Sequence, residues 1–156
     1  MSTASQLDTS AYQAPTWETI VAAHARIAPH IHRTPVLTSS SLDAVTGAQL
    51  FFKCDNFQKT GSFKIRGATN AIFSLSDAEV SHGIVTQSSG NHGASVACAA
   101  GWRGVEAWIV MPKNAPAVKR RAVESYGGRV TLCEPTMTSR SETSARGAKR
   151  CSGLRH

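Results

Sequence analysis

Two short segments of this chain combine polar and basic residues with positions at expected helix starts. The first is residues 59–64, Lys-Thr-Gly-Ser-Phe-Lys, and the second is residues 88–93, Ser-Ser-Gly-Asn-His-Gly. The second segment places hydroxyl and amide donors between two glycines, so its backbone can approach a ligand closely. Free N–H groups at a helix start suit an anion. Residues 88–93 therefore predict a site for a carboxylate or a phosphate.

Each segment also has a structural explanation that its spacing leaves open. Residues 88–93 suit an ordinary strand-to-helix turn in which Ser89 or Asn91 caps the helix. Lys64 suits a solvated charge in the first turn of an amphipathic helix. Spacing alone does not decide between these roles and chemistry.

The elements around these segments predict an α/β fold. Strands are expected at residues 84–86, 107–111 and 129–133, and helices at 91–100 and 116–126. This regular alternation predicts an open parallel sheet with flanking helices. In such a sheet ligands bind beyond the carboxyl ends of the strands, which is where residues 88–93 would lie.

Shorter patterns lie on either side of this alternation. Helices are expected at residues 17–28, capped by Thr16, and from Ser62 to about residue 75, with a strand at 50–53 between them. A last helix is expected from Ser139, with Gly147 stopping it.

Size and charge limit the classes of function. The chain has 156 residues, 41% of them hydrophobic, enough for one ordinary domain or two small lobes. We find no apolar run near the roughly 20 residues that cross a bilayer and no secretory signal pattern, so no membrane partner is expected. The four cysteines form no CxxC pair, which together with the missing signal pattern predicts a cytoplasmic location. Residues 138–156 hold five basic residues against one acidic residue, giving +4 of the net +7, so the basicity is mostly local and nucleic acid is not the expected partner.

Four segments together resemble one known family. They are Arg33-Thr34-Pro35-Val36-Leu37, Phe51-Phe52-Lys53-Cys54, residues 57–68 and residues 88–93. In order and spacing they resemble the fold-type II pyridoxal-phosphate enzymes, which have the tryptophan synthase beta-like fold. Within that family they are most similar to the serine racemases and the serine/threonine and 3-hydroxyaspartate dehydratases. The similarity extends from about Trp17 to Glu134, and more faintly to Arg146, which implies the N-terminal half of that fold.

The resemblance implies roles for the two segments. Lys64 would carry the cofactor pyridoxal 5'-phosphate and then act as a base on one face of the substrate's α carbon. Phe63 would pack beside the cofactor ring, and Asn91 would bond the cofactor's 3-hydroxyl. Ser88, Ser89, Gly90, Asn91 and His92 would hold the substrate carboxylate, with Ser89 working on the opposite face of the α carbon. The substrate would be a small amino acid, serine or threonine, and racemisation and dehydration stay open alternatives.

The resemblance also implies a nucleotide site, a homodimer and a domain division. Ser39, Ser40, Lys59, Thr60 and Tyr126 match positions near an ATP site at a dimer interface. Longer relatives also bind magnesium, but no metal ligands are expected in this chain. The expected division is a leader at 1–15, part of a large cofactor-binding domain at 16–80, a small α/β domain at 81–146 and an atypical basic tail at 147–156.

The chain also departs from the family pattern. It contains no GGGxG-like loop for the cofactor phosphate, and residues 147–156 do not resemble the family. We therefore expect a truncated, inactive racemase or ammonia-lyase. The alternative is a non-catalytic fragment or interaction module derived from that family.

Overall fold

The computed structural model of the chain describes residues 14–153, with side chains described through Ala148. The expected leader falls mainly on residues 1–13, which lie outside the described residues. The elements follow in the order α1 (Trp17–Ile27), β1 (Val36–Leu37), α2 (Ser40–Thr46), β2 (Phe52–Lys53), the 3-10 turns η2 (Asp55–Phe57) and η3 (Lys59–Gly61), α3 (Lys64–Ser74), α4 (Asp77–Val80), β3 (Ile84–Gln87), α5 (Asn91–Arg103), β4 (Ala107–Pro112), α6 (Ala117–Ser125), β5 (Arg129–Cys133) and α7 (Met137–Gly153).

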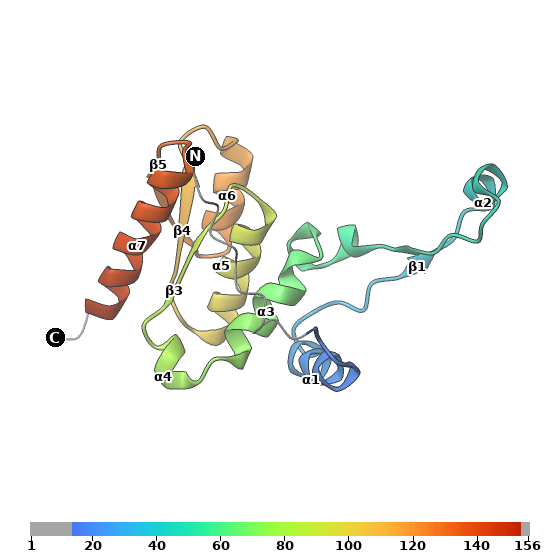
Figure 1. Cartoon of the computed structure of the whole chain (residues 1–156), viewed down its shortest axis with the longest axis horizontal. Helices are drawn as coiled ribbons and strands as arrows, with labels where there is room; N and C mark the ends of the chain where they lie inside the picture. Colours follow the sequence, from blue (N-terminus) through green and yellow to red (C-terminus); the bar gives the residue numbers. More distant parts are fainter. Residues whose placement is uncertain (1–13, 154–156) are drawn as a thin grey trace, which may run out of the picture.

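The predicted parallel sheet is confirmed. Its order is β3-β4-β5, and both pairings are parallel, with Val85 opposite Trp108 and Trp108 opposite Arg129. Helices α5 and α6 cover one face of the sheet and α7 covers the other (Figure 1). Because helices cover both faces, the central strand β4 is apolar along its whole length and mostly buried.

The core lies between this sheet and the helix pair α3 and α5. Helix α5 has a buried run of small residues from Gly93 to Ala100, which lets neighbouring elements approach it closely. Ile65 and Ile72 of α3 and Ile109 of β4 are almost completely buried in the same cluster. Burial of each such side chain stabilises the fold by roughly 1.5 to 3 kcal/mol, so this core fixes the starts of α3 and α5 relative to each other.

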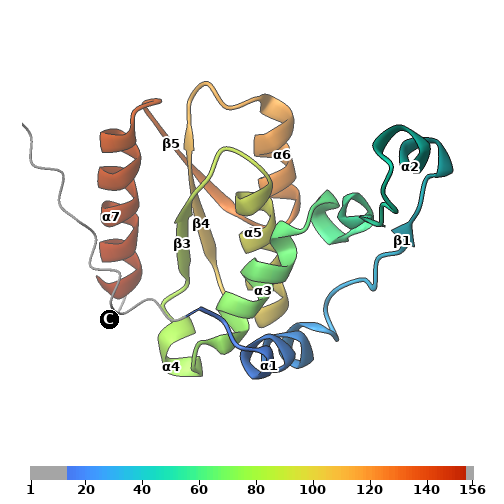
Figure 2. The ribbon, with the colours of Figure 1, turned by 45° about the vertical axis from the view of Figure 1, so that its right-hand side comes forward.

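A narrow arm projects from the α/β body. It consists of the antiparallel pair β1 and β2, with Leu37 opposite Phe52, and carries α2 at its tip, far from the sheet (Figure 2). Several of its apolar side chains face solvent, among them Val45, 83% exposed, and Phe51, 69% exposed.

A hydrogen-bonded cluster holds the foot of the arm against α3. The Asp55 carboxylate accepts two bonds from the Arg66 guanidinium, at 2.8 and 2.9 Å, and one from the Thr34 hydroxyl at 2.6 Å. The buried Gln58 amide accepts from the N–H of His32 and donates to its carbonyl. These bonds fix the segment that leads into residues 59–64.

Three expected element boundaries were wrong. Gly147 does not stop the last helix, since α7 continues to Gly153. Because Gly147 has no side chain, α7 can pack closely against β3: a Cβ at this position would lie 3.3 Å from Val85 Cγ1. Ser139 does not begin the last helix, because α7 starts at Met137. The capping hydroxyl is that of Thr136, which accepts a hydrogen bond from the N–H of Ser139. Ser62 does not cap α3, because Phe63 occupies that position and the Ser62 hydroxyl is buried without a hydrogen-bond partner among the described residues.

The Asp55 cluster leads to a prediction about acid stability. Hydrogen bonding to Arg66 is the main reason why the pKa of Asp55 falls from 3.8 to about 2. Because the folded-state pKa is lowered, the stabilisation is present above pH 3.8 and is lost as the pH falls toward 2. Asp55→Asn should lower the free energy of unfolding at pH 7 by on the order of 1 to 2 kcal/mol. The difference in free energy of unfolding between this variant and the parent, measured by urea titration, should shrink between pH 4 and pH 2.

Asp77 provides the matched control. Its carboxylate also accepts a bond from an arginine, Arg103, but its side chain is 98% exposed. Asp77→Asn should therefore lower the free energy of unfolding by less than about 1 kcal/mol, as expected for the loss of a surface ion pair. Equal losses for the two variants at pH 7 would contradict a special role for the foot of the arm.

Candidate functional site

The loop of residues 88–93 joins the carboxyl end of β3 to the start of α5. Ser88 continues the sheet, donating its N–H to the Val110 carbonyl at 3.0 Å. Its hydroxyl oxygen accepts bonds from the N–H groups of Gly90 at 3.2 Å and Gly93 at 3.0 Å. Ser88 therefore holds the loop in shape from inside.

Gly93 is required by a close approach between α5 and the sheet. A Cβ at this position would lie 2.8 Å from Ile109 Cγ2 and 3.3 Å from the Ser88 Cβ. Ile109 is fully buried, so it has little room to move away. The glycine thus sets how near the start of α5 lies to β4.

Replacing Gly93 by alanine should therefore destabilise the chain. We expect a loss of about 1 to 3 kcal/mol in the free energy of unfolding, typical of an overpacked core. Gly67→Ala is the matched control: it lies inside α3, and a Cβ there would meet no atom within 4 Å. That change should be neutral or stabilising by up to about 1 kcal/mol. Urea unfolding midpoints for both variants test this, and an unchanged midpoint for Gly93→Ala would contradict it.

Lys64 is the first residue of α3, and its side chain is exposed. Its Nζ lies 4.7 Å from the centre of the Phe63 ring, and it forms no ion pair among the described residues. Partial burial lowers the pKa of His92, and the positive charge of Lys64 lowers it further. The two segments singled out in the sequence are therefore neighbours in space.

A sharp turn directs the chain into α3. Thr60 has φ 62° and Gly61 has φ 70°, so two successive residues are left-handed. This conformation is costly for a β-branched residue. The Thr60 hydroxyl is hydrogen-bonded to the buried Ser95 hydroxyl of α5, with an O···O distance of 2.9 Å. The bond ties the turn before Lys64 to the helix that carries the loop.

Several donors at the start of α5 remain available to a ligand. The N–H groups of Asn91 and His92 and the hydroxyl of Ser89 have no hydrogen-bond partner among residues 14–153. They lie at the positive end of a 13-residue helix, where a carboxylate is favoured by roughly 0.3 to 1 kcal/mol. His92 Nε2 lies 3.3 Å from the Thr86 hydroxyl, and its lowered pKa favours the neutral ring.

Lys119 is a site residue that sequence reasoning missed. It lies in α6, and its Nζ donates to Asn91 Oδ1 at 2.9 Å. The bond uses only the carbonyl oxygen of the Asn91 amide. Lys119 belongs to no motif and follows Pro116 at an ordinary helix start, so only the packing of α6 beside α5 could reveal it.

The residues predicted for a nucleotide lie in two places within this chain. Ser39 caps α2 and Ser40 begins it, so both lie at the tip of the arm. Lys59 and Thr60 lie against α5, with Lys59 Nζ 4.9 Å from the Trp102 ring, and Tyr126 ends α6. A nucleotide site at a dimer interface stays a prediction.

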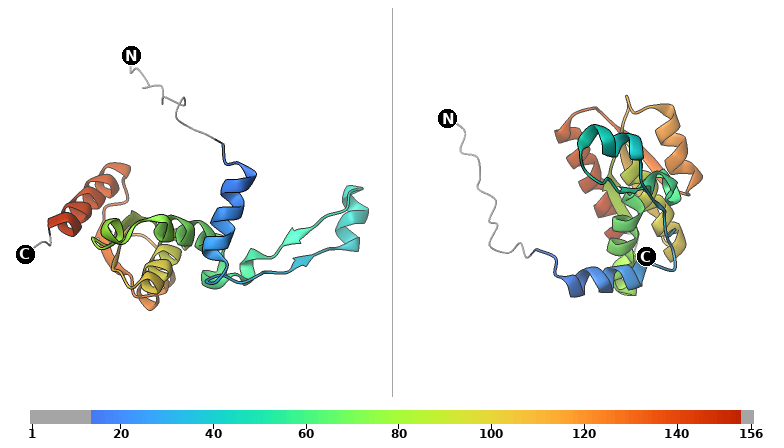
Figure 3. Two further views of the ribbon diagram at one scale, coloured as in Figure 1. Left: turned by 90° about the horizontal axis from the view of Figure 1, so that it is seen from below. Right: turned by 90° about the vertical axis from the view of Figure 1, so that its right-hand side faces the viewer.

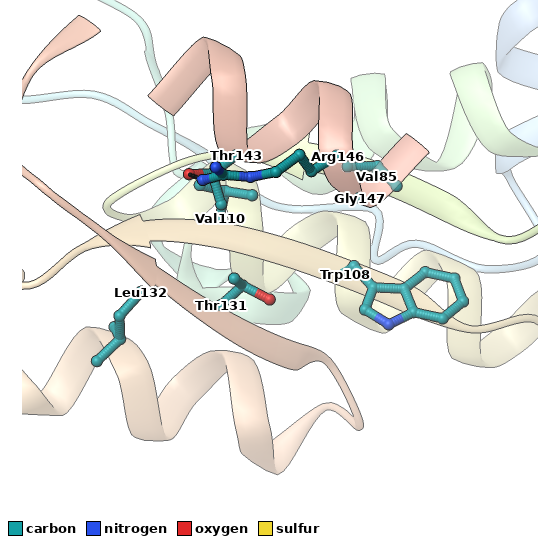
Figure 4. Close-up of a pocket in the computed structure, with 8 residues that line it drawn as sticks. All are labelled: Val85, Trp108, Val110, Thr131, Leu132, Thr143, Arg146 and Gly147. Atoms are coloured by element: carbon teal, nitrogen blue, oxygen red, sulfur yellow. Dashed lines mark hydrogen bonds between the residues drawn. The ribbon is translucent and has the colours of Figure 1, made fainter. Parts of the chain in front are cut away.

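A separate cavity of about 300 Å³ lies under α7 on the opposite face of the sheet (Figure 4). Val85, Trp108, Val110 and Arg146 are among the residues that line it, and none of the predicted site residues does. Within the described part of the chain, no group of three His, Cys, Asp or Glu residues is placed to hold a metal ion. The same part has no helix that is long and apolar enough to span a membrane.

The fold and this geometry define an α/β domain in which a lysine lies near a loop with free N–H donors at the carboxyl end of a parallel strand. Residues 27–153 match the family model described as "Pyridoxal-phosphate dependent enzyme". The chain therefore belongs to the pyridoxal-phosphate-dependent enzyme family.

Individual relatives agree with this assignment. The chain is 54% identical over 132 residues to the β-hydroxyaspartate dehydratase of Paracoccus denitrificans, covering 85% of this chain and 42% of the relative. It is 56% identical over 124 residues to a serine racemase of Oryza sativa, covering 80% of this chain and 37% of the relative. The solved structure of maize serine racemase superposes with a TM-score of 0.84 at 52% identity, covering 86% and 41%. The chain thus spans about two fifths of the length of these relatives.

Proposed function

We propose that this chain supplies the cofactor lysine and the substrate-carboxylate loop of an enzyme that racemises or dehydrates serine or a related 3-hydroxy amino acid. The observation that carries the proposal is the closeness of Lys64 to the loop at the start of α5: the hydrogen bond between Thr60 and Ser95 ties the turn before Lys64 to α5, and the lysine charge lowers the pKa of His92. The names of the relatives support the same substrate class, because they include a serine racemase and a β-hydroxyaspartate dehydratase.

The residues present fit pyridoxal phosphate. An exposed amine lies 4.7 Å from the centre of an aromatic ring and near a loop with uncommitted N–H and hydroxyl donors. When bound, the cofactor supplies an electron sink that stabilises negative charge at the substrate's α carbon. Lys64 would hold it, Phe63 would pack against it, and Asn91 would donate its side-chain amide to it.

The other steps fall to the chain's own side chains. The N–H groups of Asn91 and His92 bind the substrate carboxylate and orient the α carbon between the two segments. The Lys64 amine takes the proton from one face of that carbon, and the Ser89 hydroxyl delivers a proton to the opposite face. Dehydration needs proton removal on the lysine side and protonation of the leaving hydroxyl, so one site supports either reaction.

The activity is proposed for a longer assembly. The exposed apolar side chains of the arm, such as Val45 and Phe51, support packing against further protein. The same surface favours a second candidate function, in which the chain serves as a non-catalytic module that associates with a related enzyme. By itself, without a glycine-rich phosphate loop in its sequence, the chain is expected to give negligible turnover.

An extended chain tests the proposed activity. The chain is joined at α7 to the part of the Paracoccus dehydratase that follows the matched region and is given pyridoxal phosphate. We expect D-serine, or ammonia with pyruvate, from L-serine, and ammonia from L-threonine or 3-hydroxyaspartate if the substrate range is broader. No product from any of these, in a folded extended chain that binds the cofactor, would overturn the proposal.

A further inference from the structure

A second cavity, of about 560 Å³, lies at the foot of the arm beside α1 and α3. Figure 3 shows α1 at the base of the arm, where the arm leaves the body. The loop of residues 88–93 lies at the opposite end of the body from α1 (Figures 1 and 2). The cavity is therefore separate from the proposed substrate site.

The lining of this cavity is strongly basic. Five of its seven residues carry basic side chains, and the other two are small or apolar: His24, Ala28, Ile31, His32, Arg33, Lys53 and Arg66. None of the residues predicted for a nucleotide is among them. Lys64 and Arg66 are two residues apart on α3 and therefore lie on roughly opposite sides of it, about 200° apart around the axis, because an α-helix has 3.6 residues per turn.

These charges are only partly neutralised. Among the described residues, Asp55 is the one carboxylate bonded to a lining side chain, and its two oxygens already bind Arg66. Lys53 Nζ donates to the Thr34 carbonyl at 2.6 Å and forms no ion pair among the described residues. Arg33 has no hydrogen bond or ion pair from its side chain within the described part of the chain. Three permanent cations thus face one carboxylate.

From this arrangement we infer that the cavity binds a small polyvalent anion bearing phosphate or carboxylate groups. Like charges that converge on one cavity repel each other, and a bound anion relieves that repulsion. The Arg33 guanidinium offers paired N–H donors that match two oxygens of such a group, and Lys53 offers a point charge. Ile31 and Ala28 give the cavity an apolar wall, which limits competition from water.

Calorimetric titration of the 156-residue chain, in a buffer free of phosphate, tests this inference. Inorganic pyrophosphate and citrate are the two probes, and they distinguish phosphate from carboxylate chemistry. We expect saturable binding of at least one of them, weakened about tenfold in Arg33→Gln through loss of a charge-assisted pair. Arg33→Lys, which keeps the charge, should retain more affinity than Arg33→Gln.

Two control variants locate the binding. Arg121→Gln removes an equal charge from the exposed face of α6 and should leave the affinity unchanged. Asn91→Ala, at the proposed substrate loop, should also leave it unchanged. The inference is overturned if neither probe binds saturably, if Arg33→Gln and Arg121→Gln weaken binding equally, or if Asn91→Ala abolishes it. Failure of the proposed enzyme activity would leave these titrations unaffected.

Discussion

Lys64→Ala should lower the turnover of the extended chain by about a thousandfold or more. In the proposed mechanism the same amine holds the cofactor and moves the α proton, so its loss removes two functions at once. Lys64→Arg keeps the positive charge beside His92 but not the nucleophilic amine, and it should be nearly as inactive. Rates of D-serine and pyruvate formation from L-serine provide the measurement.

Lys113→Ala is the matched control for this prediction. Lys113 is an exposed lysine whose Nζ is bonded to Glu134, and it is not among the predicted site residues. Its replacement should change turnover less than about twofold, the effect of a weak surface ion pair. An active Lys64→Arg variant would show that the amine is not the reacting group and would refute its proposed role.

Ser89→Ala should separate the two reactions of the same extended chain. Racemisation needs a proton donor on the face opposite Lys64, and general acid–base groups contribute roughly a hundredfold to ten-thousandfold. The Ser89 hydroxyl has no hydrogen-bond partner among the described residues, so its removal leaves the loop intact. We expect D-serine formation to fall at least about a hundredfold, while pyruvate formation falls much less.

Ser88→Ala provides the contrast. The Ser88 oxygen accepts bonds from the N–H groups of Gly90 and Gly93, so its loss should deform the loop that both reactions use. D-serine and pyruvate formation should then fall together. A Ser89→Ala variant in which both products fall by the same factor would contradict a dedicated role on the second face.

The sequence predicted the sheet, and the positions of residues 59–64 and 88–93 before helices, because both follow from local patterns. The strands expected at 84–86 and 107–111 are mainly apolar runs, and the one at 129–133 begins with alternating polar and apolar residues; all three appear within two residues of the expected limits. Residues 88–93 were expected at the carboxyl end of a strand and lie there. In each case the signal was contained in a few neighbouring residues.

Features that depend on distant contacts were not predicted. A strand was expected at residues 50–53, where β2 lies, but its partner β1, the arm that the two strands form and helix α2 were not predicted, because a two-residue strand such as β1 carries no periodicity. Lys119 reaches Asn91 from another helix, across 28 positions in the sequence. Gly147 was expected to end a helix, but a contact with Val85 gives it a packing role instead. Local propensity is overridden in such places by tertiary packing.

Covalent trapping of the cofactor tests the central claim most directly. The chain has six lysines, Lys53, Lys59, Lys64, Lys113, Lys119 and Lys149, and any exposed amine can react with an aldehyde. The chain is incubated with pyridoxal phosphate, reduced with borohydride, digested and analysed by mass spectrometry. We predict that the modification concentrates on Lys64 and that Lys64→Ala loses most of the label, whereas Lys113→Ala keeps it. Label spread over the other lysines, with no decrease in Lys64→Ala, would contradict the assignment of Lys64 as the cofactor lysine.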